Sequence, residues 1–554
     1  MRKIRFHTGL LGALGLVFVA CGGSDAGAGN GSKGAGGAGG AGGTAASANG
    51  GARASGDAGA DAAGTGASGD GTAGMSPGNG ASGSGTGSGI GPRGFRRGVN
   101  PGYYGSGIDR RESAQMSVAA GASSLRTPLP EYYLKQWGDA IEVSDYAYYQ
   151  SIGLDRIVVF LEGPSAEHSN APAGASTDEL SHYSPKNLYQ PIFLADGTVN
   201  PDNYWASYVA RVVQNYGAYV DTFEVWNEPD QVGSNWQATT TWDKSAPQPS
   251  DLIWWNDTIF SYIRMLRVTW EVVHQSHPSC RVTAGGIGYD TFLAALLRFT
   301  DEPKAGAVSA DYPDTGAKYL DLIDYHYYPV FSGGSSDHGV DGFLQARDGY
   351  QARLINAKAA NRQFLVTESG APRYALGTYP GGTDYSASYL LKCMTLAHYE
   401  GFVGVDWFAQ GDGAKPGASM DSFQYMGLYL NYSDAMTVSD AKLSVQGQAY
   451  AWLGSWLPGS AADSAALSAL ALPTSVRGAA FQASTGSHLY VLWAVTSMDE
   501  SATASFALPA SADVTVHTFS VTAGAKTQTQ HANSGSVMLA LTGMPTVVEV
   551  PAGS

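Results

Sequence analysis

The chain is poor in cysteine, with 3 residues of this type among 554. None forms a C-x-x-C pair, and none joins histidines at the spacing of zinc ligands. The sequence therefore predicts neither a disulfide framework nor a metal site. We expect Cys280 and Cys393 to be buried free thiols.

Positive charge is also scarce. The chain has 32 Lys and Arg against 48 Asp and Glu, which gives a net charge of -16 and a pI near 5.0. A polyanion would be repelled by such a surface. Nucleic acids and acidic glycans are therefore excluded as expected partners.

Long apolar runs are missing too. The run "GLLGALGLVFVA" ends at Ala20 and is too short to span a bilayer. Because the basic stretch "MRKIR" precedes it, residues 1–20 are predicted to be a secretory signal peptide. The following "VFVACGG" resembles the lipobox of bacterial lipoproteins, which implies that Cys21 carries a lipid and is the only membrane contact. The alternative is an ordinary secreted protein, cleaved nearby.

Residues 21–93 form the next predicted segment. From residue 22 to about 91 they are almost entirely Gly, Ala, Ser, Thr, Asn and Asp. Such a composition cannot bury enough apolar surface to offset the entropy of ordering it. We expect a flexible linker between the lipid and the folded domains.

The remaining sequence is rich in apolar residues, and the whole chain is 44% hydrophobic and 11% aromatic. Residues 94–444 contain eight short apolar segments separated by amphipathic helical stretches such as "NYWASYVARVVQNYG". This alternation is typical of parallel strands covered by helices, and eight units favour a (β/α)₈ TIM barrel. No glycine fingerprint follows the first strand, which argues against a dinucleotide-binding sheet. The predicted strands are "RGVN", "ASSLRTPL", "DRIVVFL", "DTFEVWNE", "RVTAGG", "LDLIDYHYYP", "RQFLVTES" and "FVGVDWFA".

Residues 445–554 show a different pattern. After the helix-like "GQAYAWLGSWL", apolar and polar residues alternate between turn-forming breaks. This pattern predicts a C-terminal antiparallel β-sandwich. The sandwich could bind glycan or pack against the barrel. Its expected strands are "RGAAFQAS", "SHLYVLWAV", "TASFALP", "DVTVHTFSV", "SVMLALT" and "TVVEVP".

Two predicted barrel strands end in glutamate. Glu228 ends the fourth strand, in "FEVWNEPD", and Glu368 ends the seventh, in "LVTESG". Reactive side chains of a (β/α)₈ barrel meet at the carboxyl ends of its strands. Two opposed carboxylates without metal ligands suggest cleavage of a glycosidic bond.

The motif "WNEP" on the fourth strand and "TE" on the seventh resemble clan A of the glycoside hydrolases. "FEVWNEPD" is most similar to family 39, whereas "RGVN" and "SLRTPLP" are also similar to family 5. The resemblance implies a retaining mechanism, with Glu228 as acid and base and Glu368 as nucleophile. It further implies that Asn227 holds the sugar 2-hydroxyl and that Arg126 keeps the nucleophile ionised.

Three further residues match the clan pattern. His326 and Tyr328 in "YHYYP" match an H-x-Y motif in which the tyrosine contacts the nucleophile. Trp407 matches the aromatic floor of the sugar subsite. The plainer alternatives are a core histidine at 326, an ion-pair role for Arg126 and packing of Trp407 between strand and helix.

Other acids and aromatics near the strand ends have less specific predictions. Glu224 is expected to be structural, with a partner that the sequence does not identify. Glu162, after the third strand, could reach the pocket or cap the next element. The long loops after the third and fourth strands are expected to border the site, and they carry several tryptophans that could form outlying sugar subsites: Trp236, Trp242, Trp254 and Trp255.

These patterns predict a retaining glycoside hydrolase that acts on an oligo- or polysaccharide outside the cytoplasm. We expect a monomer that needs no cofactor and no metal, exported to the cell surface or outer membrane, or secreted. The rivals are a carbohydrate-binding lipoprotein without catalysis and a transglycosylase or processing enzyme for exopolysaccharide.

Overall fold

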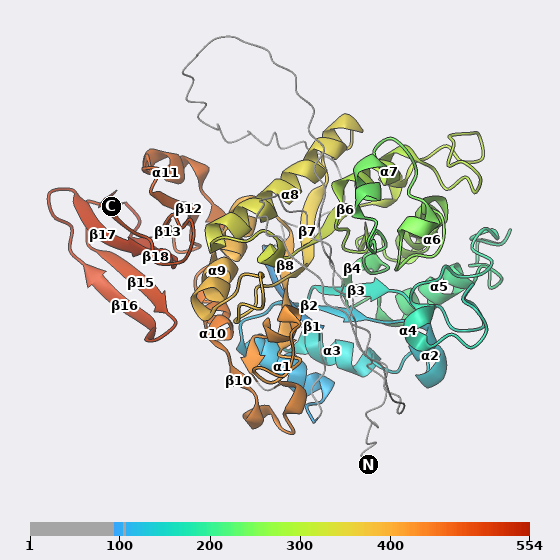
Figure 1. The fold of residues 1–554 in the computed structure, drawn as a ribbon, viewed down its shortest axis with the longest axis horizontal. Coiled ribbons are helices and arrows are strands. Elements are labelled where there is room, and N and C mark those ends of the chain that lie inside the picture. Colours follow the sequence, from blue (N-terminus) through green and yellow to red (C-terminus); the bar gives the residue numbers. More distant parts are fainter. Residues whose placement is uncertain (1–93, 103–106, 431, 554) are drawn as a thin grey trace, which may run out of the picture. The chain divides into compact units, whose positions relative to one another are not determined.

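The computed structural model describes residues 94–102, 107–430 and 432–553 (Figure 1). The predicted signal peptide, Cys21 and the predicted linker lie outside these ranges. None of the helices in the described ranges combines the length and the apolar character that a membrane crossing would need. The two cysteines of the described ranges, Cys280 and Cys393, are buried and form no disulfide there, as expected.

The predicted (β/α)₈ barrel is confirmed. Each of the eight predicted segments contains a strand, and neighbouring strands pair in parallel. A parallel bridge between Ile287 and Tyr325 joins the fifth strand's end to the sixth strand. The barrel strands are β1 Arg96–Gly102, β2 Ser124–Pro128, β3 Ile157–Leu161, β4 Val220–Val225, β5 Arg281–Ala284, β6 Leu322–Tyr327, β7 Gln363–Ser369 and β8 Gly404–Gly411.

Helices surround these strands (Figure 1). Most present an apolar face to the barrel; in α5, for example, Trp205, Val209 and Val212 are buried at helical spacing. The helices around the barrel are α1 Arg110–Ala119, α2 Glu131–Trp137, α3 Val143–Ser151, α4 Thr177–Leu180, α5 Tyr204–Tyr216, α6 Ile259–Ser276, α7 Asp290–Arg298, α8 Ser336–Asn356, α9 Thr383–Tyr399 and α10 Val445–Leu453. The last helix, α11 Ser464–Ala469, lies instead beside the C-terminal strands.

The barrel interior is apolar only in part. Val158, Leu322 and Leu365 form a small buried cluster nearer the amino ends of their strands. Two residues further along β6 and β7 stand Asp324 and Thr367, because alternate residues of a strand face the same side. The inner layer beneath the strand ends is therefore polar.

Charged groups of this polar layer come from several strands. Arg126 on β2 and Glu224 on β4 are almost completely buried, as is Asp406 on β8. Room for Asp406 exists because residue 98 on β1 is glycine: a Cβ at this position would lie 1.4 Å from Asp406 Oδ1. The layer is built from acids around the Arg126 guanidinium.

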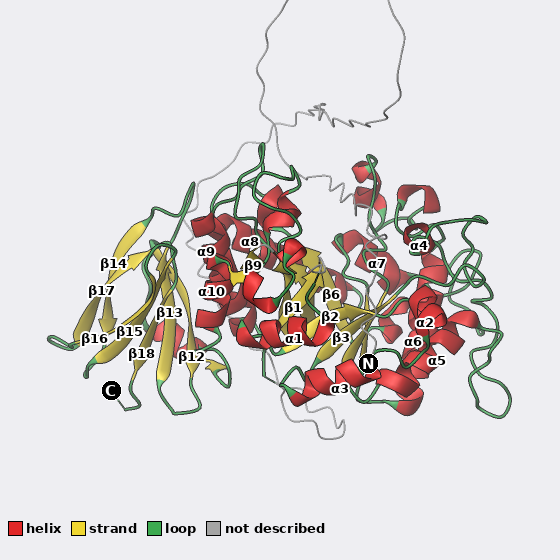
Figure 2. Cartoon of the chain, turned by 90° about the horizontal axis from the view of Figure 1, so that it is seen from below, coloured by secondary structure: helices red, strands yellow, loops and turns green. Residues whose placement is uncertain are grey.

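The predicted C-terminal sandwich is also confirmed (Figure 2). It consists of a six-stranded sheet in the order β11-β12-β13-β18-β15-β16 and a two-stranded sheet of β14 and β17. Its strands are β11 Ala461–Ala462, β12 Val476–Gln482, β13 His488–Ala494, β14 Thr503–Pro509, β15 Val514–Ser520, β16 Gly524–Gln530, β17 Ser536–Thr542 and β18 Thr546–Val550. Two short strands, β9 Tyr429–Leu430 and β10 Lys442–Leu443, extend the barrel sheet beyond β8.

Two strands of the sandwich were not predicted. β16, "GAKTQTQ", has no apolar alternation because it is an edge strand whose residues are nearly all exposed. β11 has only two residues.

The sandwich packs against the barrel at a buried ion pair between two barrel helices. Lys392 Nζ on α9 lies 2.8 Å from Asp337 Oδ2 on α8, and the lysine is fully buried. Asp337 also accepts hydrogen bonds from the Trp493 indole and the Thr496 backbone, at 2.9 Å each. These contacts show that the sandwich packs against the barrel, while its binding of glycan stays a prediction.

Candidate active site

Asn227 and Glu228 follow β4 in an irregular backbone. Trp226 and Glu228 adopt positive φ angles of 74° and 46°, which non-glycine residues rarely do. The indole of Trp226 donates to the Trp254 carbonyl at 2.8 Å, and the Glu228 N–H donates to the Gly285 carbonyl at 2.6 Å. These contacts hold the turn that brings two successive side chains, Asn227 and Glu228, to the same network.

A comparable irregularity lies at the end of β7. The pairing register of β7 with β8 shifts between Val366 and Ser369. Such a bulge breaks the strict alternation of side chains. As a result, both Thr367 and Glu368 contact groups inside the barrel mouth, namely His326 and Tyr328 respectively.

Arg126 is the centre of the site's charge network. Its Nε and Nη2 donate to the two oxygens of Glu224 at 2.7 and 2.8 Å. Nη2 also donates to Asn227 Oδ1 at 2.7 Å, and Nη1 donates to Glu368 Oε1 at 2.6 Å. Glu224 thus has the partner that the sequence did not identify, and Arg126 makes both a structural ion pair and a contact with Glu368.

Glu368 is held by three donors. Besides Arg126, the Asn100 amide donates to Oε1 at 2.9 Å and the Tyr328 hydroxyl donates to Oε2 at 2.5 Å. The Tyr328 contact is the one that the H-x-Y pattern implied. Asn100 was not predicted. Its position at the end of the predicted strand "RGVN" could have indicated that it belongs to the site.

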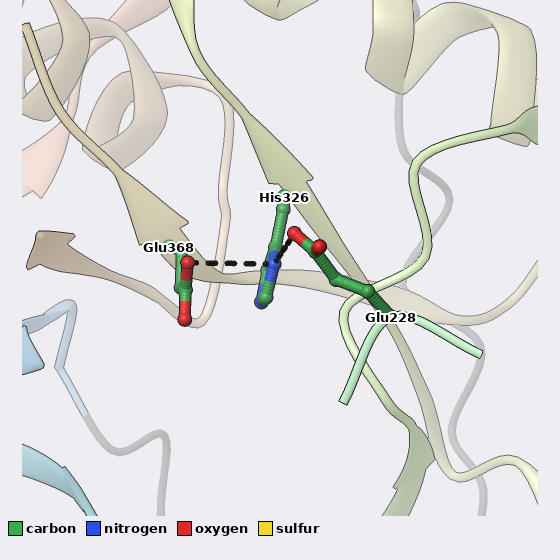
Figure 3. A group of neighbouring side chains, drawn as sticks. All are labelled: Glu228, His326 and Glu368. Carbon is green, nitrogen blue, oxygen red and sulfur yellow. Dashed lines mark hydrogen bonds and ion pairs between the residues drawn. The ribbon is translucent and has the colours of Figure 1, made fainter. Parts of the chain in front are cut away.

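His326 lies between the two glutamates (Figure 3). Its Nδ1 is 2.7 Å from Glu228 Oε1 and 3.6 Å from Glu368 Oε2. One oxygen of Glu228 and one of Glu368 lie within 4.8 Å of each other. The second oxygen of Glu228, Oε2, is buried and has no hydrogen-bond partner among the described residues.

His326 also makes a contact inside the barrel, through its other ring nitrogen. Its Nε2 is 3.0 Å from the Thr367 hydroxyl, which in turn lies 2.7 Å from Asp324 Oδ2. The Thr367 backbone N–H donates to Asp324 Oδ1 at 3.1 Å. Neither Thr367 nor Asp324 was predicted as part of the site.

Burial has the largest effect on the pKa values of Glu228 and Glu368. It raises the pKa of Glu228 well above its ordinary value, and the nearby charge of Glu368 raises it further. Burial also raises the pKa of Glu368, but Arg126 and Tyr328 oppose this shift. Glu228 is therefore the group that keeps its proton longer. Burial lowers the pKa of His326 well below its ordinary value, so its ring is neutral.

The spacing of Glu228, His326 and Glu368 would also suit a metal ion. However, the Nδ1 atom of His326 is already hydrogen-bonded to Glu228. Both oxygens of Glu368 accept hydrogen bonds, one of them from the Arg126 cation, which would repel a metal ion. The geometry suits proton transfer and nucleophilic attack better than metal binding.

Trp407 is not part of this network, which corrects its prediction as the floor of a sugar subsite. Its side chain is fully buried, and its indole donates to the Met426 carbonyl at 2.9 Å. The ring packs near Tyr389 of α9. Because side chains alternate along β8, its neighbour Phe408 instead packs near Tyr328 at the mouth.

The predicted outlying tryptophans divide into two groups. Trp242 and Trp255 are buried, whereas Trp236 is exposed and Trp254 is partly exposed. Only the second group can offer a ring face to a sugar. Glu162 is partly buried beyond the end of β3, and burial raises its pKa to about 7.

No protein-family model matches the chain, and no curated protein does. Among solved structures, a family 39 glycoside hydrolase from the gut symbiont Bacteroides cellulosilyticus WH2 is similar, with a TM-score of 0.54 and 16% identity over 83% of this chain and 81% of that one. The chain shares the fold of that glycoside hydrolase.

Two other solved structures are similar over most of their length. The catalytic domain of GH30 xylanase C from Talaromyces cellulolyticus has a TM-score of 0.49 at 14% identity, over 82% of this chain and 98% of that one. The GH51 α-L-arabinofuranosidase from Thermotoga petrophila RKU-1 has a TM-score of 0.49 at 11% identity, over 83% and 97%.

Replacing Arg126 by methionine should destabilise the barrel. The substitution leaves Glu224 and Glu368 buried without their cation, which typically costs about 3–5 kcal/mol of unfolding free energy. The loss should shrink as the pH falls, because protons then neutralise the unpaired carboxylates. Denaturant unfolding at several pH values measures both effects.

The matched control is Arg111→Met, which removes an exposed arginine paired with Asp145 and should change the unfolding free energy little. Equal losses in the two variants, or a loss in Arg126→Met that grows as the pH falls, would contradict the role of Arg126.

Proposed function

We propose that the protein is a retaining glycoside hydrolase that cleaves an oligo- or polysaccharide outside the cytoplasm. The observation that supports this most is the carboxylate pair, whose nearest oxygens lie within 4.8 Å. Retaining enzymes hold their carboxyl groups about 5–5.5 Å apart, whereas inverting enzymes leave about 6.5 Å or more for a water molecule.

The proposed roles follow from the surroundings of each glutamate. Glu368, ionised and oriented by Arg126, Asn100 and Tyr328, attacks the anomeric carbon and forms a glycosyl ester. Glu228 gives its proton to the departing oxygen in the same step. In the second step it takes a proton from the water that hydrolyses the ester.

Asn227 is proposed to bind the sugar next to the broken bond. Its Oδ1 is occupied by the Arg126 guanidinium at 2.7 Å, which orients the amide. The amide N–H₂ is then the group that can donate to a sugar hydroxyl. A hydrogen bond to the 2-hydroxyl strengthens as positive charge develops on the ring in the transition state.

The proposed location rests on the sequence. The apolar run that ends at Ala20, followed by Cys21 and a Gly-rich segment, supports export and attachment through a lipid on Cys21. The negative net charge favours a neutral rather than an acidic glycan as substrate.

A screen of plant, fungal and bacterial polysaccharides with the purified residues 94–554 tests the assignment. Glu228→Gln and Glu368→Gln should each lower the release of reducing sugar by at least about 10²-fold, because each removes one half of the reaction. The matched control Glu167→Gln changes a surface glutamate whose side chain is 79% exposed, and it should remain as active as the parent.

Three results of that screen would contradict the proposal. Unchanged cleavage in either active-site variant would refute the roles of the two glutamates. A parent protein that binds a glycan without cleaving it would indicate a carbohydrate-binding protein instead. Transfer to an added acceptor sugar in preference to water would indicate a transglycosylase.

The pH profile should be bell-shaped, because deprotonation of Glu368 raises the activity whereas deprotonation of Glu228 lowers it. Activity rises as the pH climbs through the pKa of Glu368, which must be ionised, and falls as it climbs through the pKa of Glu228, which must be protonated. In Glu228→Gln, kcat/KM for a dinitrophenyl glycoside should keep the acid limb and lose the alkaline limb, since this leaving group departs without a proton. An alkaline limb that persists in the variant would assign it to another group.

A further inference from the structure

Glu228 ends a continuous chain of polar contacts that runs from the barrel interior. Asp324 Oδ2 lies 2.7 Å from the Thr367 hydroxyl, the hydroxyl lies 3.0 Å from His326 Nε2, and His326 Nδ1 lies 2.7 Å from Glu228 Oε1. All four side chains are buried. The far oxygen of Glu228, Oε2, is the end without a partner among the described residues.

The number of protons limits how this chain can be arranged. The Thr367 hydroxyl has one proton, and its two near acceptors are Asp324 Oδ2 and His326 Nε2. A third acceptor, Glu224 Oε1, lies farther away at 3.5 Å and already accepts from Arg126. The neutral imidazole likewise has one N–H, which stands either on Nδ1 or on Nε2. The state of Asp324 therefore determines the direction of each hydrogen bond as far as Glu228.

With a neutral Asp324, every contact has one proton. The carboxyl O–H donates to the Thr367 oxygen, the Thr367 O–H donates to His326 Nε2, and His326 Nδ1–H donates to Glu228 Oε1. The proton of Glu228 then stands on Oε2, the oxygen that no described residue occupies.

With an ionised Asp324, the hydrogen bonds between Asp324 and Glu228 run in the opposite direction. Thr367 turns its O–H to the carboxylate, and His326 must donate from Nε2. Its Nδ1 lone pair then faces Glu228 Oε1 at 2.7 Å, which holds the proton of Glu228 on Oε1. Glu228 Oε2 has no proton to give in this arrangement.

We propose that neutral Asp324 is a positioning residue that acts through Thr367 and His326 to keep the catalytic proton of Glu228 on Oε2. The inference rests on the proposed glycosidase function. When the leaving oxygen takes this proton, the O–H bond at Oε2 breaks and a new O–H bond forms on the leaving group. The other protons of the chain stay in place, and His326 Nδ1–H stabilises the resulting carboxylate.

The surroundings of Asp324 favour its neutral form. Burial raises the pKa of Asp324 well above its ordinary value, and the charge of Glu224 on β4 raises it further, while Arg126 on β2 opposes the shift. However, Arg126 is already hydrogen-bonded to both oxygens of Glu224. Two buried phenols also interact electrostatically with Asp324, Tyr262 on α6 and Tyr350 on α8, and burial raises the pKa of both well above the ordinary value, so they are neutral.

The pair Thr367→Val and Thr367→Ser tests the relay. Valine keeps the shape of threonine without its hydroxyl, whereas serine keeps the hydroxyl. For a phenyl glycoside of the sugar found in the screen, Thr367→Val should lower kcat about 10–100-fold with little change in KM, and Thr367→Ser should stay within about 3-fold of the parent. With a dinitrophenyl glycoside, the loss in kcat/KM of Thr367→Val should fall below about 3-fold, because this leaving group needs no proton.

The pair Asp324→Asn and Asp324→Leu tests which form of Asp324 acts. The asparagine N–H₂ can donate to Thr367 as the neutral carboxyl does, while its oxygen accepts from the Thr367 backbone N–H. Asp324→Asn should therefore keep more than a third of the parent kcat with the phenyl glycoside, and Asp324→Leu should lose activity as Thr367→Val does. Thermal unfolding of each variant shows that the barrel is folded.

The outcomes separate this inference from the proposed function. If Glu228→Gln is inactive on the phenyl glycoside but Thr367→Val matches the parent, the relay is wrong and the function stands. Equal losses of Thr367→Val on both glycosides would show general damage and overturn the relay. Asp324→Asn as impaired as Asp324→Leu would overturn the neutral state of Asp324. A fully active Glu228→Gln would refute the proposed function itself.

Discussion

The buried guanidinium of Arg126 is the contact on which the site depends. It neutralises Glu224 inside the barrel, orients Asn227 and donates to Glu368 at 2.6 Å. One cation thus connects strands β2, β4 and β7 at the level where the barrel interior opens to the strand ends. Without it, the inner acids would be buried without compensation, and the carboxylate proposed as nucleophile would lose its strongest donor.

Much of the fold and part of the site could be predicted, because strand periodicity is visible in the sequence. In "LIDYHY" the alternation places Leu322, Asp324 and His326 on the inner side and the residues between them on the outer side. The same rule applied to "GVDWFAQG" would have placed Asp406 and Phe408 inside and Trp407 against the helices. The prediction for Trp407 followed a motif where periodicity was the better guide.

The parts of the site that could not be predicted depend on backbone features that no residue pattern reveals. The positive φ of Trp226 and Glu228 and the register shift after Val366 let adjacent side chains share one network. Both depend on contacts between distant segments, such as that of Glu228 with Gly285. Thr367 could therefore not be predicted as a site residue beside Glu368, because strict alternation would have placed the two side chains on opposite faces.

Glu368 is proposed to attack the anomeric carbon, while Glu228 donates and then accepts the proton. Trapping the enzyme with an activated fluorinated glycoside of its substrate sugar, followed by peptide mapping, tests this most directly. If Glu368 is the nucleophile, one covalent label per chain forms on Glu368 and is absent in Glu368→Gln. A label on another carboxylate, or none on an enzyme that turns over the parent glycoside with inversion, would contradict it.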